Sequence, residues 1–470
     1  MHVSAIDAGV ADIVAPVQEL PQKIVAYLRH ALHIARTDAA HPEGSDPEKI
    51  HPEAAAKDVA EPGEISSSIS KLKEKFPSVL TGEDFLNAAM TFVADAGSFA
   101  AAVVRIDDSR HIINPSQVMM LLAAALNKLC KKVSGMWGIV NHDSLGCFFP
   151  GKTGEKCRVM IDALKKHLSG KCTETVSAGL AVYPALTYDK RHILDNAGKA
   201  LEHAAFFGPN SCVAFDAVSL NISGDKYYQN GDIEGAMREF HLGLALDPDN
   251  INVHNSLGVC YGIKGDLDKA LQEFKAAIRL APKEIMAMYN TGYVYFLKKE
   301  YSTALDYFLK AERIDSSVFE LAIQTGRIYL ELNQPENAKK YIETATALNP
   351  KSAAAFRLMG DTYTLLDRIS DATTAYKTAL KLNPENAEAL SALGYLYEIQ
   401  TKNAEIALMF CRQAAGIDPK NGLFHHRLGR LYLNRNQAEA ALDAFQKARE
   451  LGYPSDEYIA QALKIVSSER

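Results

Sequence analysis

The chain has 470 residues, which is enough for two or more domains, and its hydrophobic content of 47% supports buried cores. A formal net charge of −6 is too small to suggest strong attraction to nucleic acid or anionic lipid. No run of about 18 apolar residues occurs, so we expect no membrane-spanning helix, and the N-terminal segment lacks the basic start of a secretory signal. The 7 cysteines are dispersed and form no C-x-x-C pair, which favours reduced thiols and a cytoplasmic location.

The first part of the chain predicts a helix followed by a linker. Apolar residues at Ile24, Leu28 and Leu32 have the spacing of one helix face, and we assign residues 1–36 to a helical extension. Residues 37–66 are rich in alanine, proline, serine and acidic residues, which bury little apolar surface. We therefore expect a flexible linker there.

Residues 67–216 predict a domain in which helices and strands alternate. The two middle strands form a hairpin joined by a tight Asn-His-Asp-Ser turn. The expected strands are 100–106, 135–140, 145–149 and 174–183, and the expected helices are 83–95, 116–132, 153–168 and 190–206. This order, β-α-β-β-α-β with flanking helices, predicts an α+β fold with a palm-like sheet.

The rest of the chain carries a repeat of 34 residues. A glycine recurs at this spacing, with one step of 35, and a tyrosine follows each glycine three residues later. These pairs are Gly224 and Tyr227, Gly258 and Tyr261, Gly292 and Tyr295, Gly326 and Tyr329, Gly360 and Tyr363, Gly394 and Tyr397, and Gly429 and Tyr432. The period is typical of helical-hairpin arrays, so we predict seven hairpins over 217–455 and a capping helix over 456–470.

One unit shows why each repeat should form two helices. Gly265 suits the left-handed conformation that ends the first helix. Ala270 and Phe274 lie one turn apart on one face of the second helix, which Pro282 ends because proline lacks an N–H. Small glycines and alanines let the helices approach closely, and the larger residues fill the remaining space.

This pattern closely resembles the tetratricopeptide repeat (TPR), which implies an all-α superhelix whose first helices line a concave groove. The family's inward-facing positions correspond here to Asn221, Asp225, Asn255, Tyr289, Tyr293, Arg327, Arg357, Asp361, Tyr395, His426 and Arg430. The resemblance implies that this groove binds a protein or peptide, and tyrosines with arginines suit such contacts. Arg327 and Arg357 come from neighbouring repeats and could face one another across a carboxylate. The lysine–asparagine clamp of members that bind chaperone tails is not reproduced.

The α+β domain resembles the GGDEF domain of diguanylate cyclases. The resemblance rests on the hairpin 136–149, on the strand phrase from Val176 through Pro184, and on the helix phrase from Leu194 to Asn210. The positions that correspond to the family's acidic strand motif and signature turn are Arg105, Asp107, Asn141, His142, Asp143, Ser144 and Leu145.

Several of these positions lack the groups that the family's chemistry requires. The resemblance places Arg105 where the family has a metal-binding aspartate and Ser144 where it has a glutamate ligand. Asn141 and His142 replace the two glycines that let backbone approach the nucleotide. A guanidinium in place of a carboxylate repels a divalent cation, so we expect a degenerate domain with no catalytic residues, no metal and no cofactor.

Three functions follow from these resemblances. The first is a non-enzymatic bacterial signalling or assembly scaffold, which grips a protein partner in the groove and uses the silent domain as a second, self-associating surface. The second is an effector that binds guanine nucleotide or cyclic di-GMP without turnover, and the third is a residual diguanylate cyclase. Arg105 and Ser144 argue against the third, and Arg105 could instead contact a phosphate or an acidic partner.

Overall fold

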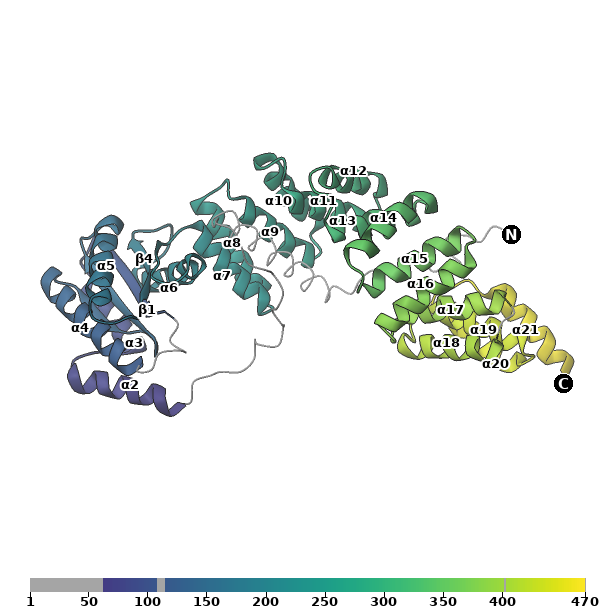
Figure 1. The fold of residues 1–470 in the computed structure, drawn as a ribbon, viewed down its shortest axis with the longest axis horizontal. Coiled ribbons are helices and arrows are strands. Elements are labelled where there is room, and N and C mark those ends of the chain that lie inside the picture. The colour runs from purple at the N-terminus through teal and green to yellow at the C-terminus, as the bar shows by residue number, and fades with distance from the viewer. Residues whose placement is uncertain (1–61, 108–114, 401–402, 470) are drawn as a thin grey trace. The chain divides into compact units, whose positions relative to one another are not determined.

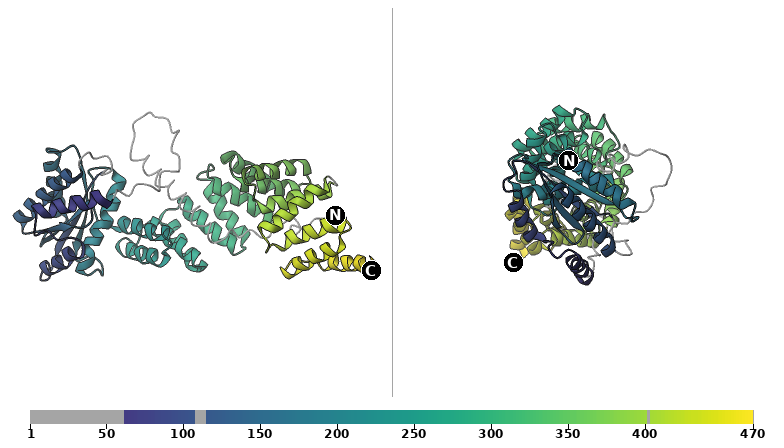
Figure 2. Two further views of the ribbon diagram at one scale, coloured as in Figure 1. Left: turned by 90° about the horizontal axis from the view of Figure 1, so that it is seen from below. Right: turned by 90° about the vertical axis from the view of Figure 1, so that its left-hand side faces the viewer.

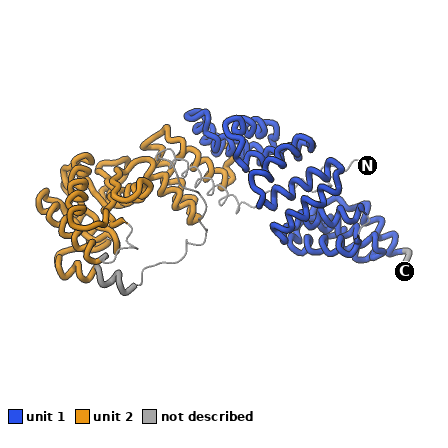
Figure 3. The backbone as a smooth tube through the Cα atoms, in the orientation of Figure 1, with its two compact units in different colours: residues 1–20, 270–470 blue, residues 21–269 orange. Residues whose placement is uncertain are grey.

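The computed structural model describes residues 62–107, 115–400 and 403–469 (Figure 1). The helix predicted in 1–36 and most of the predicted linker lie outside these residues. The described chain forms two compact units, which we call the N-terminal unit (within 62–269) and the C-terminal unit (within 270–469) (Figure 3). The boundary falls inside the repeat array, so the first repeat belongs to the N-terminal unit.

The N-terminal unit begins with an α/β region. Its strands are β1 (Phe99–Ile106), β2 (Met136–Ile139), β3 (Ser144–Pro150), β4 (Val176–Tyr183) and β5 (Cys212–Ala214). Its helices are α2 (Pro62–Lys75), α3 (Gly82–Phe92), α4 (Pro115–Val133), α5 (Gly154–Ser169), η2 (Lys190–His192), α6 (Ile193–Ala204) and η3 (Ala205–Phe207). The predicted β-α-β-β-α-β order is confirmed as β1-α4-β2-β3-α5-β4, and β5 is a strand that the sequence did not predict.

The five strands form one sheet in the order β2-β3-β1-β4-β5. β1 is antiparallel to both of its neighbours, and β5 runs parallel to β4. Helices α4 and α5 cover one face with residues such as Leu122 and Ile161, and α3 and α6 cover the other with residues such as Phe85 and Leu201 (Figure 2). Because both faces are covered, β1 is a nearly continuous apolar run rather than an alternating one.

One boundary of the predicted linker is wrong. Residues 62–66 were expected to be flexible, but they form the first part of α2, which packs against α4. Ile69 and Leu72 explain the difference, because both pack against the core beneath α4 and Leu72 is almost completely buried. Burial of the apolar face of an amphipathic helix therefore outweighs the polar composition of its first turns.

The array confirms the predicted hairpins, with seven helix pairs and one final helix. The helices are α7 (Ala217–Gln229), α8 (Ile233–Leu246), α9 (Ile251–Ile263), α10 (Leu267–Leu280), α11 (Ile285–Leu297), α12 (Tyr301–Glu312), α13 (Phe319–Glu331), α14 (Pro335–Leu348), α15 (Ala353–Leu365), α16 (Ile369–Leu382), α17 (Ala387–Ile399), α18 (Ala404–Ile417), α19 (Gly422–Asn434), α20 (Ala438–Glu450) and α21 (Asp456–Glu469). None of the helices in the described ranges is long and apolar enough to cross a bilayer.

The repeated glycines lie where the two helices of a repeat touch. A Cβ atom added at Gly360 would lie 2.5 Å from a ring carbon of Tyr376, and one at Gly292 would lie 2.6 Å from the ring of Phe308. The predicted pairing of a small residue with a large one is therefore confirmed. The turn between the helices uses left-handed residues at one recurring position, including Gly265 (φ 80), Asn333 (φ 54) and Asp367 (φ 55).

Candidate functional site

The first helices of the repeats are placed to form an inner wall. Besides packing on the second helix of its own repeat, α15 also contacts α13 and α17, and α17 contacts α19. Contacts between successive first helices indicate that this side of the C-terminal unit is the crowded, concave one. Six of the predicted groove residues lie on these helices, and they are Arg327, Arg357, Asp361, Tyr395, His426 and Arg430. Tyr289 and Tyr293 lie on α11 of the same unit, whereas Asn221, Asp225 and Asn255 lie on α7 and α9 of the N-terminal unit.

The structure separates the predicted groove residues into two sets. Seven are half-buried, and they are Asn221, Asp225, Tyr289, Tyr293, Arg327, Tyr395 and Arg430. Four are buried, and they are Asn255, Arg357, Asp361 and His426. Only the half-buried set keeps side-chain surface for a partner, so the proposed contact residues are these seven.

An aromatic patch lies on α11 and α13 and consists of Tyr289, Tyr293, Phe296 and Arg327. The Tyr289 and Tyr293 rings are stacked with centroids 6.2 Å apart, and the Tyr293 and Phe296 rings with centroids 6.1 Å apart. The guanidinium carbon of Arg327 lies 4.9 Å from the centre of the Phe296 ring, in cation–π geometry. Packing on neighbouring rings limits the rotamers of these side chains, so a partner would meet a rigid surface.

Arg357 and Asp361 serve the interior of their own repeat. They form an ion pair one helical turn apart, and Tyr376 on α16 donates a hydrogen bond of 2.6 Å to the Asp361 carboxylate. Arg357 was expected to share a carboxylate with Arg327, but its described carboxylate partner is Asp361 of the same helix, inside the repeat. The prediction that Arg357 and Asp361 line an open groove is corrected on this point, because both side chains are buried and paired.

Two arginines flank Tyr395 near the C-terminal end of the array. The guanidinium carbons of Arg427 and Arg430 lie 5.0 and 5.4 Å from the centre of the Tyr395 ring. Arg430 also forms an ion pair of 3.1 Å with Glu398. His426 instead packs between its own helix α19 and the start of α21, where its Nδ1 lies 2.9 Å from Ser455 Oγ. It is therefore a packing residue.

A second candidate site is a cavity of about 430 Å³ in the α/β region, which we call the Arg105 pocket. It lies between α3, β1, the β2–β3 turn and α6, and its floor is apolar, with Phe85, Val103 and Leu201. Four of the seven residues to which the GGDEF resemblance pointed, which we call the GGDEF-like positions, line it: Arg105, Asn141, Asp143 and Ser144.

The other three GGDEF-like positions lie elsewhere. His142 is exposed at the turn, and Leu145 is completely buried in the core. Asp107 accepts hydrogen bonds of 2.7 Å from the Thr175 hydroxyl and from the Asn210 amide, so it holds the end of β1 to the loop before β5.

The cations of the Arg105 pocket are paired with carboxylates. Arg105 binds Glu202 on α6 at 2.8 Å, and Lys226 on α7 binds the same carboxylate at 2.7 Å. Burial alone would raise the pKa of Glu202, but hydrogen bonds and charge from Lys226 and Arg105 outweigh burial and lower it. Arg191 is likewise paired with Glu83. No group of three or more histidine, cysteine, aspartate or glutamate side chains is placed to share a metal ion within the described ranges.

The model of one protein family matches this chain. The family is described as "Cilia and flagella-associated protein 70 C-terminal domain", and its model matches residues 185–464, which is more than half of the chain. The chain belongs to this family. It is a family of tetratricopeptide repeats, so the chain is a TPR protein, and its array is a scaffold fold for protein–protein interaction.

Solved structures that are similar to this chain are more distant. A tetratricopeptide repeat protein from Parabacteroides merdae ATCC 43184 is 19% identical, with a TM-score of 0.42 over 53% of this chain and 98% of its own. YrrB, described as a TPR protein with an unusual peptide-binding site, is 24% identical, with a TM-score of 0.35 over 40% of this chain and 96% of its own. PilF from Pseudomonas aeruginosa is 20% identical, with a TM-score of 0.41 over 44% and 94%. A comparison with curated proteins gives no match.

The family match begins before the first repeat and includes α6. This helix packs on β4 on one side and on α7 on the other. Lys199 of α6 binds Glu239 of α8 at 2.9 Å, and His203 lies 3.2 Å from Asp216, the residue that caps α7. The TPR family therefore includes a helix that is also part of the α/β region.

Sequence reasoning did not find Glu202, Arg191 or Lys199 as partners in these sites. Glu202 lies 97 residues from Arg105 along the chain, and no spacing rule links the two. The only signal available was Arg105 itself, since a guanidinium at the end of a buried strand needs an acidic partner.

Proposed function

We propose that the protein is a non-catalytic scaffold that binds a protein or peptide partner along the inner face of its TPR array. The observation that carries the proposal is the aromatic patch, in which three stacked rings meet Arg327. The side chains of the patch are half-buried, so packing orders the rings while part of their surface stays accessible to a partner. Aromatic side chains beside an arginine are the groups that contribute most to protein interfaces.

The α/β region is proposed to be a silent relative of the GGDEF domain that offers a second interaction surface, including self-association. The pairing of Arg105 with Glu202 supports this, because the resemblance aligns Arg105 with a metal-binding aspartate of the family, and here a cation bound to a carboxylate occupies that position. A cytoplasmic signalling or assembly role in a bacterium belongs to the same proposal. The family's own description refers to a protein associated with cilia and flagella, a setting in which an assembly scaffold would also fit.

Affinity capture with the full chain as bait tests the inner face. Arg327→Glu reverses a charge in the aromatic patch, and Lys340→Glu makes the same change at an exposed position on the second helix α14. We expect Arg327→Glu to reduce recovery of specific partners at least about ten-fold, as expected for an interface hot spot, and Lys340→Glu to leave it unchanged. Circular dichroism controls for folding. Equal recovery with both variants would overturn the inner-face assignment.

A second candidate is an effector that binds guanine nucleotide or cyclic di-GMP without turnover. The Arg105 pocket favours it, because the cavity has the size of a small-molecule site and collects four GGDEF-like positions. The carboxylate partners of Arg105 and Arg191 count against it, since a phosphate group would have to displace them.

Thermal-shift measurements with GTP and cyclic di-GMP, with and without magnesium, separate these candidates. Gly198→Trp is the control, because its indole would fill the pocket. Gly198 lines the pocket, and a Cβ added there meets nothing within 4 Å. A shift of several degrees that Gly198→Trp abolishes would favour the effector over the simple scaffold. Formation of cyclic di-GMP above a buffer control would instead indicate a residual diguanylate cyclase.

A further inference from the structure

The two edges of the sheet differ in how they are protected. At one edge, β2 is covered by the segment before α3, because Thr81 bridges to Ile139 and the Ile139 amide donates a 3.0 Å hydrogen bond to Leu80. At the other edge, β5 pairs with β4 on one side, and no described strand pairs with its other side. Open edges attract further strands unless they are blocked, so β5 is the accessible edge of the sheet.

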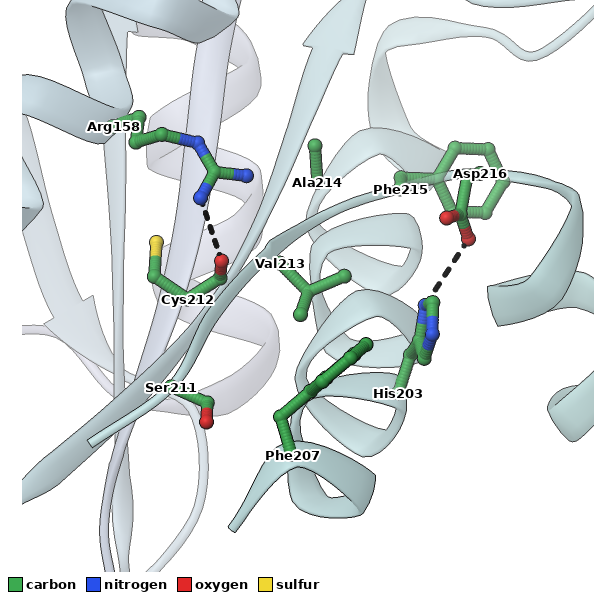
Figure 4. A pocket seen from close by; sticks show the side chains of 9 residues that line it. All are labelled: Arg158, His203, Phe207, Ser211, Cys212, Val213, Ala214, Phe215 and Asp216. Carbon is green, nitrogen blue, oxygen red and sulfur yellow. Dashed lines mark hydrogen bonds and ion pairs between the residues drawn. The ribbon is translucent and has the colours of Figure 1, made fainter. Parts of the chain in front are cut away.

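The backbone of β5 points its hydrogen-bonding groups alternately toward β4 and toward the open edge. The Ser211 carbonyl accepts a 2.9 Å hydrogen bond from Ala178, and the Phe215 amide donates one of 2.7 Å to Leu180. Cys212 and Ala214 alternate with these residues, so their backbone N–H and C=O groups point away from β4, toward the open edge. Arg158 on α5 confirms this orientation, since its Nη1 donates a 2.8 Å hydrogen bond to the Cys212 carbonyl (Figure 4).

A hollow of about 530 Å³ follows this edge, and we call it the β5 groove. One wall is Arg158 on α5, and the other is formed by His203 on α6 and Phe207 on η3 (Figure 4). Phe207 is 67% exposed, which is high for a phenylalanine. Asp216 holds His203 in place at 3.2 Å, so this wall is fixed at the start of the repeat array.

The two walls have different chemistry. Cys212 packs toward the core under α4 and α5, so side chains on that face of an added strand would meet Arg158. Phe215 packs toward the core under α3 and α6, so side chains on the other face would meet Phe207. Lys165 also lies on the α5 wall and donates to the Asn210 carbonyl, and Asp162 offsets its charge. Arg158 therefore leaves this wall positive.

We propose that an extended segment of a partner protein adds to β5 as a further strand, with acidic residues facing α5 and apolar residues facing Phe207. Main-chain hydrogen bonds to the Cys212 amide and to the Ala214 amide and carbonyl would supply affinity, and the alternation of side chains in a strand would supply specificity. The inference rests on the proposed scaffold function, because it names the partner chemistry of its second surface.

The test uses the full chain and a short capped peptide that alternates valine with glutamate. The control peptide alternates valine with lysine, which keeps strand propensity and the apolar face. By fluorescence anisotropy, we expect the glutamate peptide to bind at least about ten-fold more tightly, and Arg158→Glu to reverse this preference. Binding that ignores the charge of the peptide would overturn the proposal.

Ala214→Pro removes the outward N–H of β5, and Ala214→Thr is the matched variant that keeps it. Proline is tolerated on an edge strand whose N–H faces solvent, so Ala214→Pro should fold and yet bind the peptide at least about ten-fold more weakly. In wild type, hydrogen exchange at the Ala214 amide should slow only when the peptide is added. Equal peptide binding by both variants would overturn the proposal. So would an amide that is already protected without peptide, which would mean that a segment of this chain or a second copy occupies the edge.

These outcomes are independent of the inner-face experiment. Loss of peptide binding in Ala214→Pro with no effect of Arg327→Glu on partner capture would support the β5 groove and refute partner binding at the inner face of the TPR array. The opposite pair of results would refute the β5 groove alone.

Discussion

Tyr376 and Asp361 are joined by a hydrogen bond of 2.6 Å from the phenol to the carboxylate, inside the repeat formed by α15 and α16. The carboxylate also pairs with Arg357, and all three side chains are buried. Burial raises the pKa of Tyr376 well above its usual range, so the phenol remains a donor. The three groups form a buried polar network centred on the Asp361 carboxylate, and such a network tolerates loss of a member poorly.

Asp361→Ala should destabilise the C-terminal unit much more than Tyr376→Phe. The first change leaves the Arg357 guanidinium buried without its counter-charge, at a cost of about 3–5 kcal/mol in the free energy of unfolding. The second removes one donor and keeps the ring, at a cost of about 1–2 kcal/mol. Urea unfolding followed by circular dichroism measures both. If the double change Arg357→Leu with Asp361→Leu were as damaging as Asp361→Ala, uncompensated charge would not be the cause.

Gly360→Ala should destabilise the same repeat, whereas Gly416→Ala should not. A Cβ at Gly360 would lie 2.5 Å from the Tyr376 ring, which the hydrogen bond to Asp361 holds in place, so we expect a loss of about 1–3 kcal/mol from overpacking. A Cβ at Gly416 meets nothing within 4 Å, and alanine suits a helix better than glycine by about 0.5–1 kcal/mol. Hydrogen exchange of α15 and α16 should rise in the first variant and stay unchanged in the second.

The hairpins could be predicted because their signals are local. Glycine, alanine and aromatic residues recur at fixed spacings, and Gly360 against Tyr376 shows that the spacing reports a contact within one repeat. The palm-like order of strands followed from short apolar runs bounded by turns. The three-residue strand β5 was missed because it is too short to show a period, and its place depends on pairing with β4.

The role of the recurring tyrosine could not be predicted, although its position was plain. In several repeats its hydroxyl meets the side chain 20 residues earlier, on the second helix of the preceding repeat. These pairs are His241 with Tyr261, Lys275 with Tyr295, Glu343 with Tyr363, and Arg412 with Tyr432. The partner changes from histidine to lysine, glutamate and arginine, so no residue type repeats to reveal the contact.

The candidate sites were less predictable than the fold for a related reason. Family positions showed which residues face inward, but packing between neighbouring repeats decides whether they stay accessible. Arg357 and Arg327 occupy comparable inward-facing positions, and the first is buried in a network while the second lies on an aromatic ring.

Two of the 7 cysteines should react with a thiol reagent in the folded protein. Cys172 and Cys212 are half-buried, and the other five are buried. Burial raises the pKa of Cys130 and Cys411 to about 12, so few thiolates form at neutral pH. A chromogenic disulfide assay should titrate two thiols in buffer and all seven in denaturant. The valine–glutamate peptide should slow the reaction of Cys212 and leave that of Cys172 unchanged, and slowing at both would point to a global effect instead.

The N-terminal unit should lose stability as the pH rises toward neutrality, because of Asp225 on α7. Burial raises the pKa of Asp225 from 3.8 to about 7, and the Asn221 side-chain amide donates a 3.4 Å hydrogen bond to its carboxyl group. The folded state then holds a proton that the unfolded chain releases, so the stabilisation is complete below about pH 4 and is lost as the pH rises through about 7. Linkage sets the loss at roughly 4 kcal/mol at most, and partial exposure reduces it.

Asp225→Asn removes this titration and should therefore make the unit more stable than wild type at pH 8, with little difference at pH 4. Chemical denaturation of both proteins across this range, followed by hydrogen exchange of α7 and α9, measures the effect. Parallel pH profiles for wild type and Asp225→Asn would contradict this prediction, because the asparagine side chain has no carboxyl proton to release and cannot produce the same pH dependence.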